Sequence, residues 1–90
     1  MSTGVPRRTL GVRVRRVDGN LVVGLESEAL ELTDAAKLIY ESANGRNRVD
    51  DIVGIVADTY EAEPTEVSDD VHEFLDELTD RGVVEWVPLP

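Results

Sequence analysis

Residues 64–82 read PTEVSDDVHEFLDELTDRG, and this stretch decides how we interpret the rest of the chain. Its apolar residues recur every three or four positions, which predicts one apolar face on an amphipathic helix. These residues are Val67, Val71, Phe74, Leu75 and Leu78. Thr65 is the expected N-cap, and Gly82 is expected to end the helix. A helix of this kind either packs wholly into a core or forms one wall of a binding groove, and the pattern alone leaves both open.

Two further helices are predicted before this one. Thr33 can cap a helix whose apolar side includes Leu38 and Ile39 and which ends at Asn44-Gly45. Residues 49–60 then form an almost unbroken apolar helix face, with Asn47 and Asp50 as a plausible capping pair.

The region before these helices predicts strands. Val12 and Val14 alternate with arginines, Asp18-Gly19-Asn20 is a turn signal, and residues 21–25 alternate again. Ala29–Leu32 is a short third strand. We therefore predict a winged-helix-like α+β fold, in which a three-stranded antiparallel sheet packs on three helices. We expect residues 1–10 to be a flexible basic tail, residues 11–87 to form one domain ending in an extended segment, and residues 88–90 to be a C-terminal tail.

Composition excludes several classes of protein. The 90 residues include no cysteine, so there are no disulfides, thiolate nucleophiles or cysteine-based zinc sites. The sequence has neither a membrane-spanning run nor a signal-peptide core, so a cytoplasmic location is expected. Residues 1–16 contain five arginines and no acid, whereas all 19 acidic residues follow them. An acidic body suits a basic peptide or a basic patch on a partner protein.

No motif for catalysis, a cofactor or a metal is found. His72 has Asp69 and Asp76 on the same helix surface, but a lone histidine beside two carboxylates is more often a solvated charge cluster than a metal site. The serines lack a base or a nucleophile elbow, and the glycines form no phosphate loop. The acidic helix would also repel DNA, although the arginine-rich first strand keeps a winged-helix nucleic-acid binder as an alternative.

A peptide-binding groove remains as the main hypothesis. If the strand at residues 28–32 lies at the sheet edge, an extended peptide can pair with it and place alternate side chains against the helix at residues 67–78. Asp70 and Glu77 could then meet basic residues of that peptide. In the alternative, the helix stripe is wholly core and the C-terminal tail covers the edge.

The order of several short motifs resembles the PqqD family, whose members bind leader peptides during ribosomal peptide modification. The motifs are Leu32-Thr33, Asn44-Gly45, Val49-Asp50-Asp51-Ile52, Asp70-Val71-His72-Glu73-Phe74-Leu75 with Leu78, and Gly82-Val83-Val84, and the resemblance covers about residues 12–86. It implies a non-catalytic protein that binds a precursor leader between the third strand and the third helix and delivers it to a modifying enzyme. The implied contacts are Glu28, Ala29, Leu30, Glu31 and Leu32 on the strand, and Val67, Asp70, Val71, Phe74, Leu75 and Leu78 on the helix.

The resemblance implies two possible pathways. Members similar to the pyrroloquinoline quinone protein usually carry proline before the third strand, whereas this chain has Leu25-Glu26-Ser27-Glu28. We therefore predict a stand-alone recognition element of lasso-peptide biosynthesis that serves a leader peptidase. The alternative is a chaperone of the quinone precursor that serves a radical SAM enzyme. Neither role requires a cofactor in this chain.

Overall fold

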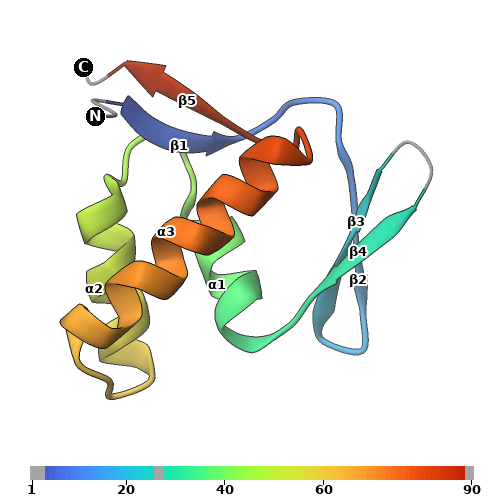
Figure 1. The fold of residues 1–90 in the computed structure, drawn as a ribbon. Helices are drawn as coiled ribbons and strands as arrows, with labels where there is room; N and C mark the ends of the chain where they lie inside the picture. The colour runs from blue at the N-terminus through green and yellow to red at the C-terminus, as the bar shows by residue number, and fades with distance from the viewer. Residues whose placement is uncertain (1–3, 26–27, 89–90) are drawn as a thin grey trace.

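The computed structural model of the chain describes residues 4–25 and 28–88. Figure 1 shows helices and strands in one α+β arrangement, with the two described ends of the chain close together. The elements are β1 (Gly4–Arg8), β2 (Arg13–Val17), β3 (Asn20–Gly24), β4 (Ala29–Leu32), α1 (Asp34–Ser42), α2 (Val49–Thr59), α3 (Pro64–Asp80) and β5 (Val84–Pro88). The predicted fold class, three helices with a three-stranded antiparallel sheet, is confirmed.

The three-stranded sheet has the order β2-β3-β4, with both neighbouring pairs antiparallel. Asp18 (φ 52°) and Gly19 (φ 85°) form the tight turn between β2 and β3. Two consecutive residues of positive φ give the turn a twist that matches that of the strands, which explains the Asp-Gly sequence. The third strand has the predicted bounds and lies at an edge, directly before α1.

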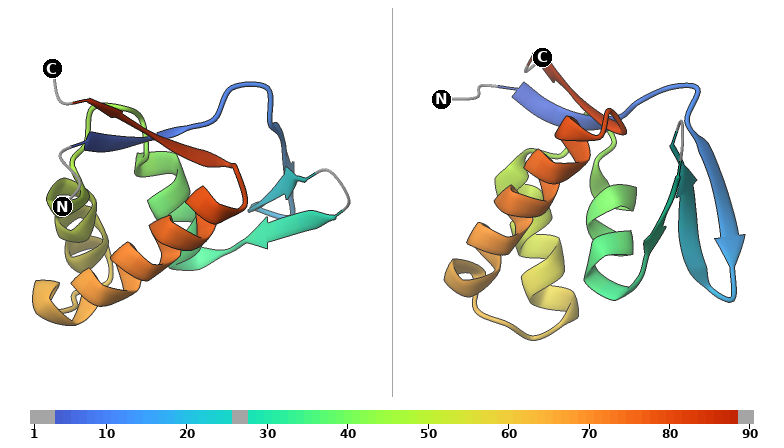
Figure 2. Two further views of the ribbon diagram at one scale, coloured as in Figure 1. Left: turned by 45° about the horizontal axis from the view of Figure 1, so that its top comes forward. Right: turned by 45° about the vertical axis from the view of Figure 1, so that its right-hand side comes forward.

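A second sheet, formed by β1 and β5, corrects the prediction of a flexible N-terminal tail at residues 4–8, while residues 1–3 of that predicted tail lie outside the described residues. Gly4–Arg8 pairs antiparallel with Val84–Pro88 along its whole length, and Val5 is completely buried. Pro88 pairs with Gly4, so the predicted start of the C-terminal tail at residue 88 is also wrong; residues 89–90 lie outside the described residues. The two strands come from opposite ends of the chain, and a pairing this distant leaves no local period in the sequence. Figure 2 shows the pair lying across the ends of the helices.

The helix starts differ from two of the predicted caps. Glu63, rather than Thr65, is the N-cap of α3, because Pro64 occupies the first helical turn, where its missing N–H costs nothing. In α2 the Asp51 carboxylate accepts the Arg48 N–H at 2.9 Å, so Arg48 and Asp51 replace the expected pair of Asn47 and Asp50. The predicted stop at Gly82 is confirmed by its φ of 78° just after α3.

The core consists of two apolar clusters that meet at α3. One joins α2 to α3 and α1, and the other joins the sheet to α1, β5 and the C-terminal end of α3. Phe74, half-buried, packs against both clusters. Trp86 of β5 packs on the first cluster and donates its Nε1–H to the Thr79 hydroxyl of α3 at 2.8 Å. These contacts join the sheets and helices into one unit.

Tyr40 gives the fold a testable pH dependence. Burial raises the pKa of the Tyr40 phenol above its ordinary value of 10.0, and the positive charge of Arg8 opposes this rise more weakly. The native protein therefore holds this proton more tightly than the unfolded chain, so stability is lost as the pH rises above about 10. Between about pH 8 and about pH 11, we expect the free energy of unfolding to fall less in Tyr40→Phe than in the unsubstituted protein. Urea titrations of both proteins measure it, and equal losses would contradict the assignment.

Candidate functional site

The outer edge of β4 offers unpaired backbone groups. Leu25 N–H donates to the Glu28 carbonyl at 2.7 Å, and this bond shows which residue pairs between β3 and β4 are hydrogen-bonded. Since bonded and non-bonded pairs alternate, Leu30 and Leu32 bond toward β3, while the backbone groups of Ala29 and Glu31 point away from it. Within residues 4–25 and 28–88, no strand pairs with this edge. Because Val84–Pro88 pairs with β1, it does not cover β4.

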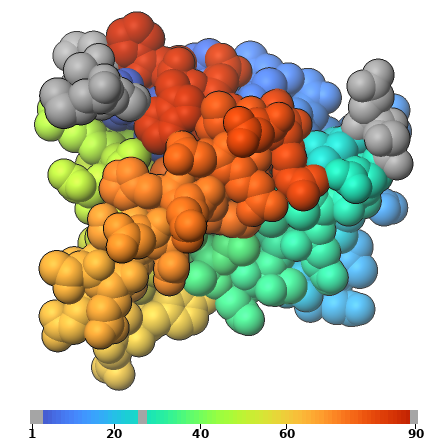
Figure 3. All heavy atoms as spheres, viewed as in Figure 1, coloured from blue at the N-terminus to red at the C-terminus, as the bar shows by residue number. Residues whose placement is uncertain are grey.

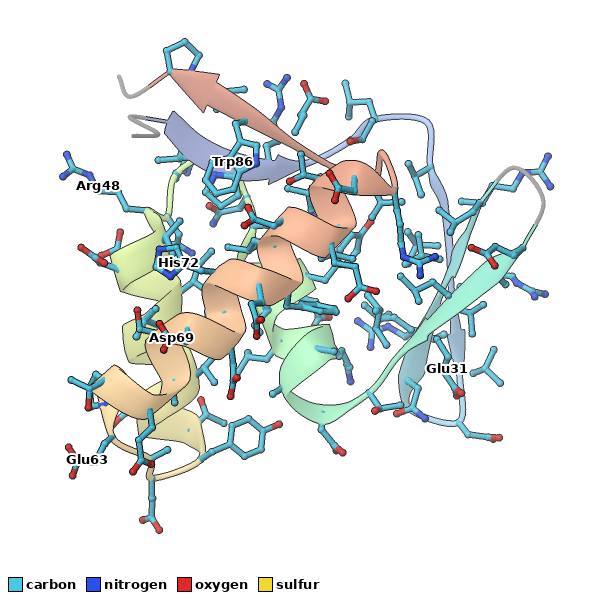
Figure 4. All side chains as sticks on the ribbon, viewed as in Figure 1. Glu31, Arg48, Glu63, Asp69, His72 and Trp86 are labelled. Atoms are coloured by element: carbon cyan, nitrogen blue, oxygen red, sulfur yellow. The ribbon has the colours of Figure 1, made fainter. Side chains whose placement is uncertain are left out.

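The β4 side chains divide between the two faces of the sheet. Leu30 and Leu32 lie opposite the buried Val23 and Leu21, so they face the helices, and Leu32 is buried within the second cluster. Ala29 and Glu31 face the other way and are exposed. Figure 4 labels Glu31, which projects from β4 away from the helices. The strand therefore presents Leu30 as a half-buried apolar contact and leaves two backbone positions free.

On α3 the structure separates the predicted contacts into two groups. Val71, Leu75 and Leu78 have no exposed surface, and Val67 is nearly as buried. Because a bound peptide cannot touch fully buried side chains, these four residues, like Leu32, do not fit their predicted role as direct contacts in this arrangement. They support the site from beneath. Asp70, which is exposed, and the half-buried Phe74 remain accessible.

An open, strongly acidic hollow of about 590 Å³ lies along the accessible side of α3. Its lining residues are Asp70, Glu73, Phe74, Asp76, Glu77 and Asp80. Phe74 is therefore the apolar part of a surface that is otherwise carboxylate. In Figure 3 this surface of α3 lies on the same face of the molecule as α1 and β4. A ligand that lies along α3 and β4 would meet an aromatic ring surrounded by negative charge.

Arg81, which was not among the predicted site residues, connects the two walls of the site. Its Nη1 lies 2.8 Å from Oε1 of Glu28, which directly precedes β4, and its Nη2 lies 3.4 Å from Glu77 Oε1 on α3. The only sequence signal was that Arg81 is the single basic group in a long acidic stretch. Since these groups are partly exposed, water and salt weaken the pairs. Their position is the informative part, because they close one end of the space between strand and helix.

His72 is engaged within its own helix. Its Nδ1–H donates to the Ser68 carbonyl at 2.8 Å, and Figure 4 shows both His72 and Asp69 projecting from α3. Among the described residues, no group of three or more histidine, cysteine or acidic side chains could hold a metal ion. No helix within the described ranges is long and apolar enough to cross a membrane.

Comparisons with known proteins bear on the family and the fold of this chain. Residues 19–84 match the model of the family described as coenzyme PQQ synthesis protein D (PqqD). The bifunctional coenzyme PQQ synthesis protein C/D of Methylorubrum extorquens is 32% identical over 83 residues, which are 90% of this chain and 22% of that protein. This chain thus spans about a fifth of the curated relative it matches.

A solved structure gives a similar result. The solution NMR structure of the PqqD truncation of Methylobacterium extorquens PqqCD, described as a functional, stand-alone recognition element for ribosomally synthesised and post-translationally modified peptides, has a TM-score of 0.73 at 31% identity. The match covers 90% of this chain and 88% of that one. The family predicted from the short motifs is confirmed: the chain belongs to the PqqD family.

Proposed function

We propose that this protein binds the leader peptide of a ribosomally synthesised precursor as an additional strand on β4 and delivers it to a modifying enzyme, without catalysing a reaction itself. The observation that carries this proposal is the unpaired edge of β4, with the backbone groups of Ala29 and Glu31 directed outward beside the exposed face of α3. Family membership and the likeness to a recognition element support the same function.

The proposed complex uses backbone and side chains for different purposes. The leader backbone pairs with Ala29 and Glu31, which gives affinity that is largely independent of sequence. Every second leader side chain then points toward α3 and meets Leu30 or Phe74. An aromatic or leucine side chain suits this apolar position, because Phe74 is half-buried and packs against both core clusters.

Charge adds a second requirement for the leader. Glu28 and Glu77 are already paired with Arg81. The carboxylates that have no ion-pair partner among the described residues are Asp70 and Glu73 on the helix side and Glu31 on the strand. Acidic leader residues next to these groups would be repelled, whereas lysine or arginine would be attracted. We therefore expect the bound part of the leader to be neutral or basic at the positions that flank its apolar anchor.

The sequence and the comparisons favour different partner enzymes. The segment before β4 lacks proline, which favours a lasso-peptide recognition element that serves a leader peptidase. Both named relatives are PQQ synthesis proteins, which favours the quinone precursor and a radical SAM enzyme. In either case the substrate is newly made by ribosomes, and we place the activity in the cytoplasm.

Fluorescence polarisation with labelled leaders tests the site and the pathway together. We expect saturable binding to one of two leader types, lasso or quinone, and a reduction in affinity of about tenfold or more in Asp70→Arg. Asp70 is exposed, so its replacement should leave the fold unchanged. Asp58→Arg on α2 is the matched control, because it makes the same change in net charge at an exposed position outside the proposed site.

Two results would count against the proposal. If neither leader binds to protein that is shown to be folded, the β4 edge is not a leader site. If Asp58→Arg weakens binding as much as Asp70→Arg, the effect comes from net charge rather than from the proposed site. Binding to duplex DNA that falls steeply with added salt would instead support the nucleic-acid alternative.

A further inference from the structure

The opposite edge of the three-stranded sheet is also open. Among the described residues, no strand pairs with the outer side of β2. The backbone groups of Val22 and Gly24 point toward β2. The pairs Arg15–Val22 and Arg13–Gly24 are therefore the hydrogen-bonded pairs between β2 and β3. The backbone groups of Val14 and Arg16 therefore point to solvent. The sheet has two edges available for pairing, separated by β3.

This edge has an unusual surface. Every residue of β2 is exposed. Four large apolar residues of the described chain are strongly exposed, and three of them lie in or next to β2: Leu10 (86%), Val14 (42%) and Val17 (41%). Leu10 and Val14 also line a hollow of about 350 Å³ together with Arg8 and Tyr40. The arginines of β2 are the kind of charge that protects an edge strand from aggregation, but the exposed apolar residues do not serve that purpose.

The charge of this surface is the reverse of that on α3. Neither Arg13 nor Arg15 makes an ion pair with a described residue, and Arg16 lies 3.4 Å from Glu41. Arg13, Arg15 and Val17 share the outer face of the sheet, while Val14 and Arg16 lie on the face toward the helices. A partner strand on β2 would thus meet alternating basic and apolar positions on both faces.

We propose that the β2 edge, with Leu10, is a second docking surface, and that its occupant is an acidic, extended segment of the enzyme to which the leader is delivered. This inference rests on the proposed function, because it assigns the second edge to the other partner. Charge complementarity selects the occupant: glutamate or aspartate can pair with Arg13, Arg15 and Arg16, and apolar side chains can cover Val14 and Val17. The same acidic segment would be repelled by the carboxylates around β4, so the two edges discriminate between the two partners.

Other partners fit this surface less well. A DNA duplex or an anionic membrane would interact with the arginines, but neither would pair with the backbone of Val14 and Arg16. A second copy of this chain could bring its β4 edge to β2, but that contact is head-to-tail, would form rings or open chains of molecules, and would occupy the edge proposed for the leader. An acidic strand uses the charges, the apolar residues and the backbone groups together.

A designed probe peptide tests the inference directly. The probe alternates glutamate with valine and is N-methylated along one edge, so that its free edge can pair with the protein and it cannot form sheets of more than two strands with itself. We expect saturable binding, with NMR shift changes at the amides of Val14 and Arg16 and none at Ala29 and Glu31. Val14→Pro removes an outward N–H without removing a bond to β3, and should lower affinity for the probe at least about tenfold. The same peptide with lysine in place of glutamate should not bind β2.

Each alternative result has a definite meaning. The inference is wrong if the acidic probe does not bind, if its shift changes appear at β4, or if Val14→Pro leaves its affinity unchanged. It is also wrong if phosphatidylserine vesicles or duplex DNA bind through Arg13 and Arg15 while the probe does not. Leader binding is measured in parallel, and Val14→Pro should leave it intact. If the unsubstituted protein binds the acidic probe at β2 but binds no leader, the proposed function is contradicted and the β2 surface is not.

Discussion

Replacing Glu31 with proline is expected to lower leader affinity at least about tenfold without unfolding the protein. The Glu31 N–H points out of the sheet, so proline removes a donor for the leader but no bond to β3. Proline is tolerated on edge strands for this reason, and its ring also blocks the approach of another strand. Fluorescence polarisation gives the affinity, and urea unfolding shows that stability is retained.

Two variants separate the backbone effect from other causes. Glu31→Ala removes the same carboxylate but keeps the N–H, so it should bind the leader with nearly normal affinity. Leu30→Pro removes an N–H that bonds toward β3 and should destabilise the fold instead. If Glu31→Pro binds the leader as well as Glu31→Ala does, the leader does not pair with the outer edge of β4.

The second large effect is expected at Val5. Val5→Asp places a carboxylate at a completely buried position between β1 and the rest of the protein. An unpaired charge there should cost more than about 3 kcal/mol of stability. Trp86, the only tryptophan, lies on the partner strand β5 and supplies the fluorescence signal for urea unfolding.

Arg8→Ser is the matched control on the same strand. Arg8 is exposed, and its backbone N–H still donates to the Ala43 carbonyl at 3.1 Å after the change. A surface substitution of this kind should change stability by no more than about 0.5 kcal/mol. Equal, small effects of both variants would show that Gly4–Arg8 does not pack on the protein in solution.

Local periodicity was sufficient to predict most of the fold. The period-two alternation of residues 21–25 and Ala29–Leu32, and the helical spacing from Val67 to Leu78, arise from burial of one face, so the sequence records them directly. The β1–β5 sheet could not be predicted in this way. Gly4–Arg8 contains Pro6 and a single valine, and its burial depends on a strand at the other end of the chain.

The candidate site was predicted only in part for a related reason. Helical spacing identifies the apolar stripe of α3, but not which of its residues lie under other elements. Val71, Leu75 and Leu78 are completely covered, whereas Phe74 lies at the border between covered and open surface. Arg81 was missed because its partner Glu28 is far away in sequence. The arginines of β2 were noted as a charge cluster, but their place on a second open edge required the strand order.

Hydrogen exchange of the β4 amides tests the central claim most directly. With saturating leader, we expect the amides of Ala29 and Glu31 to become strongly protected, because each would donate to the leader backbone. The amides of Val14 and Arg16, on the opposite edge, should exchange at unchanged rates and serve as the internal control. If the leader binds but the amides of Ala29 and Glu31 exchange as fast as in the free protein, the leader is not an added strand on β4.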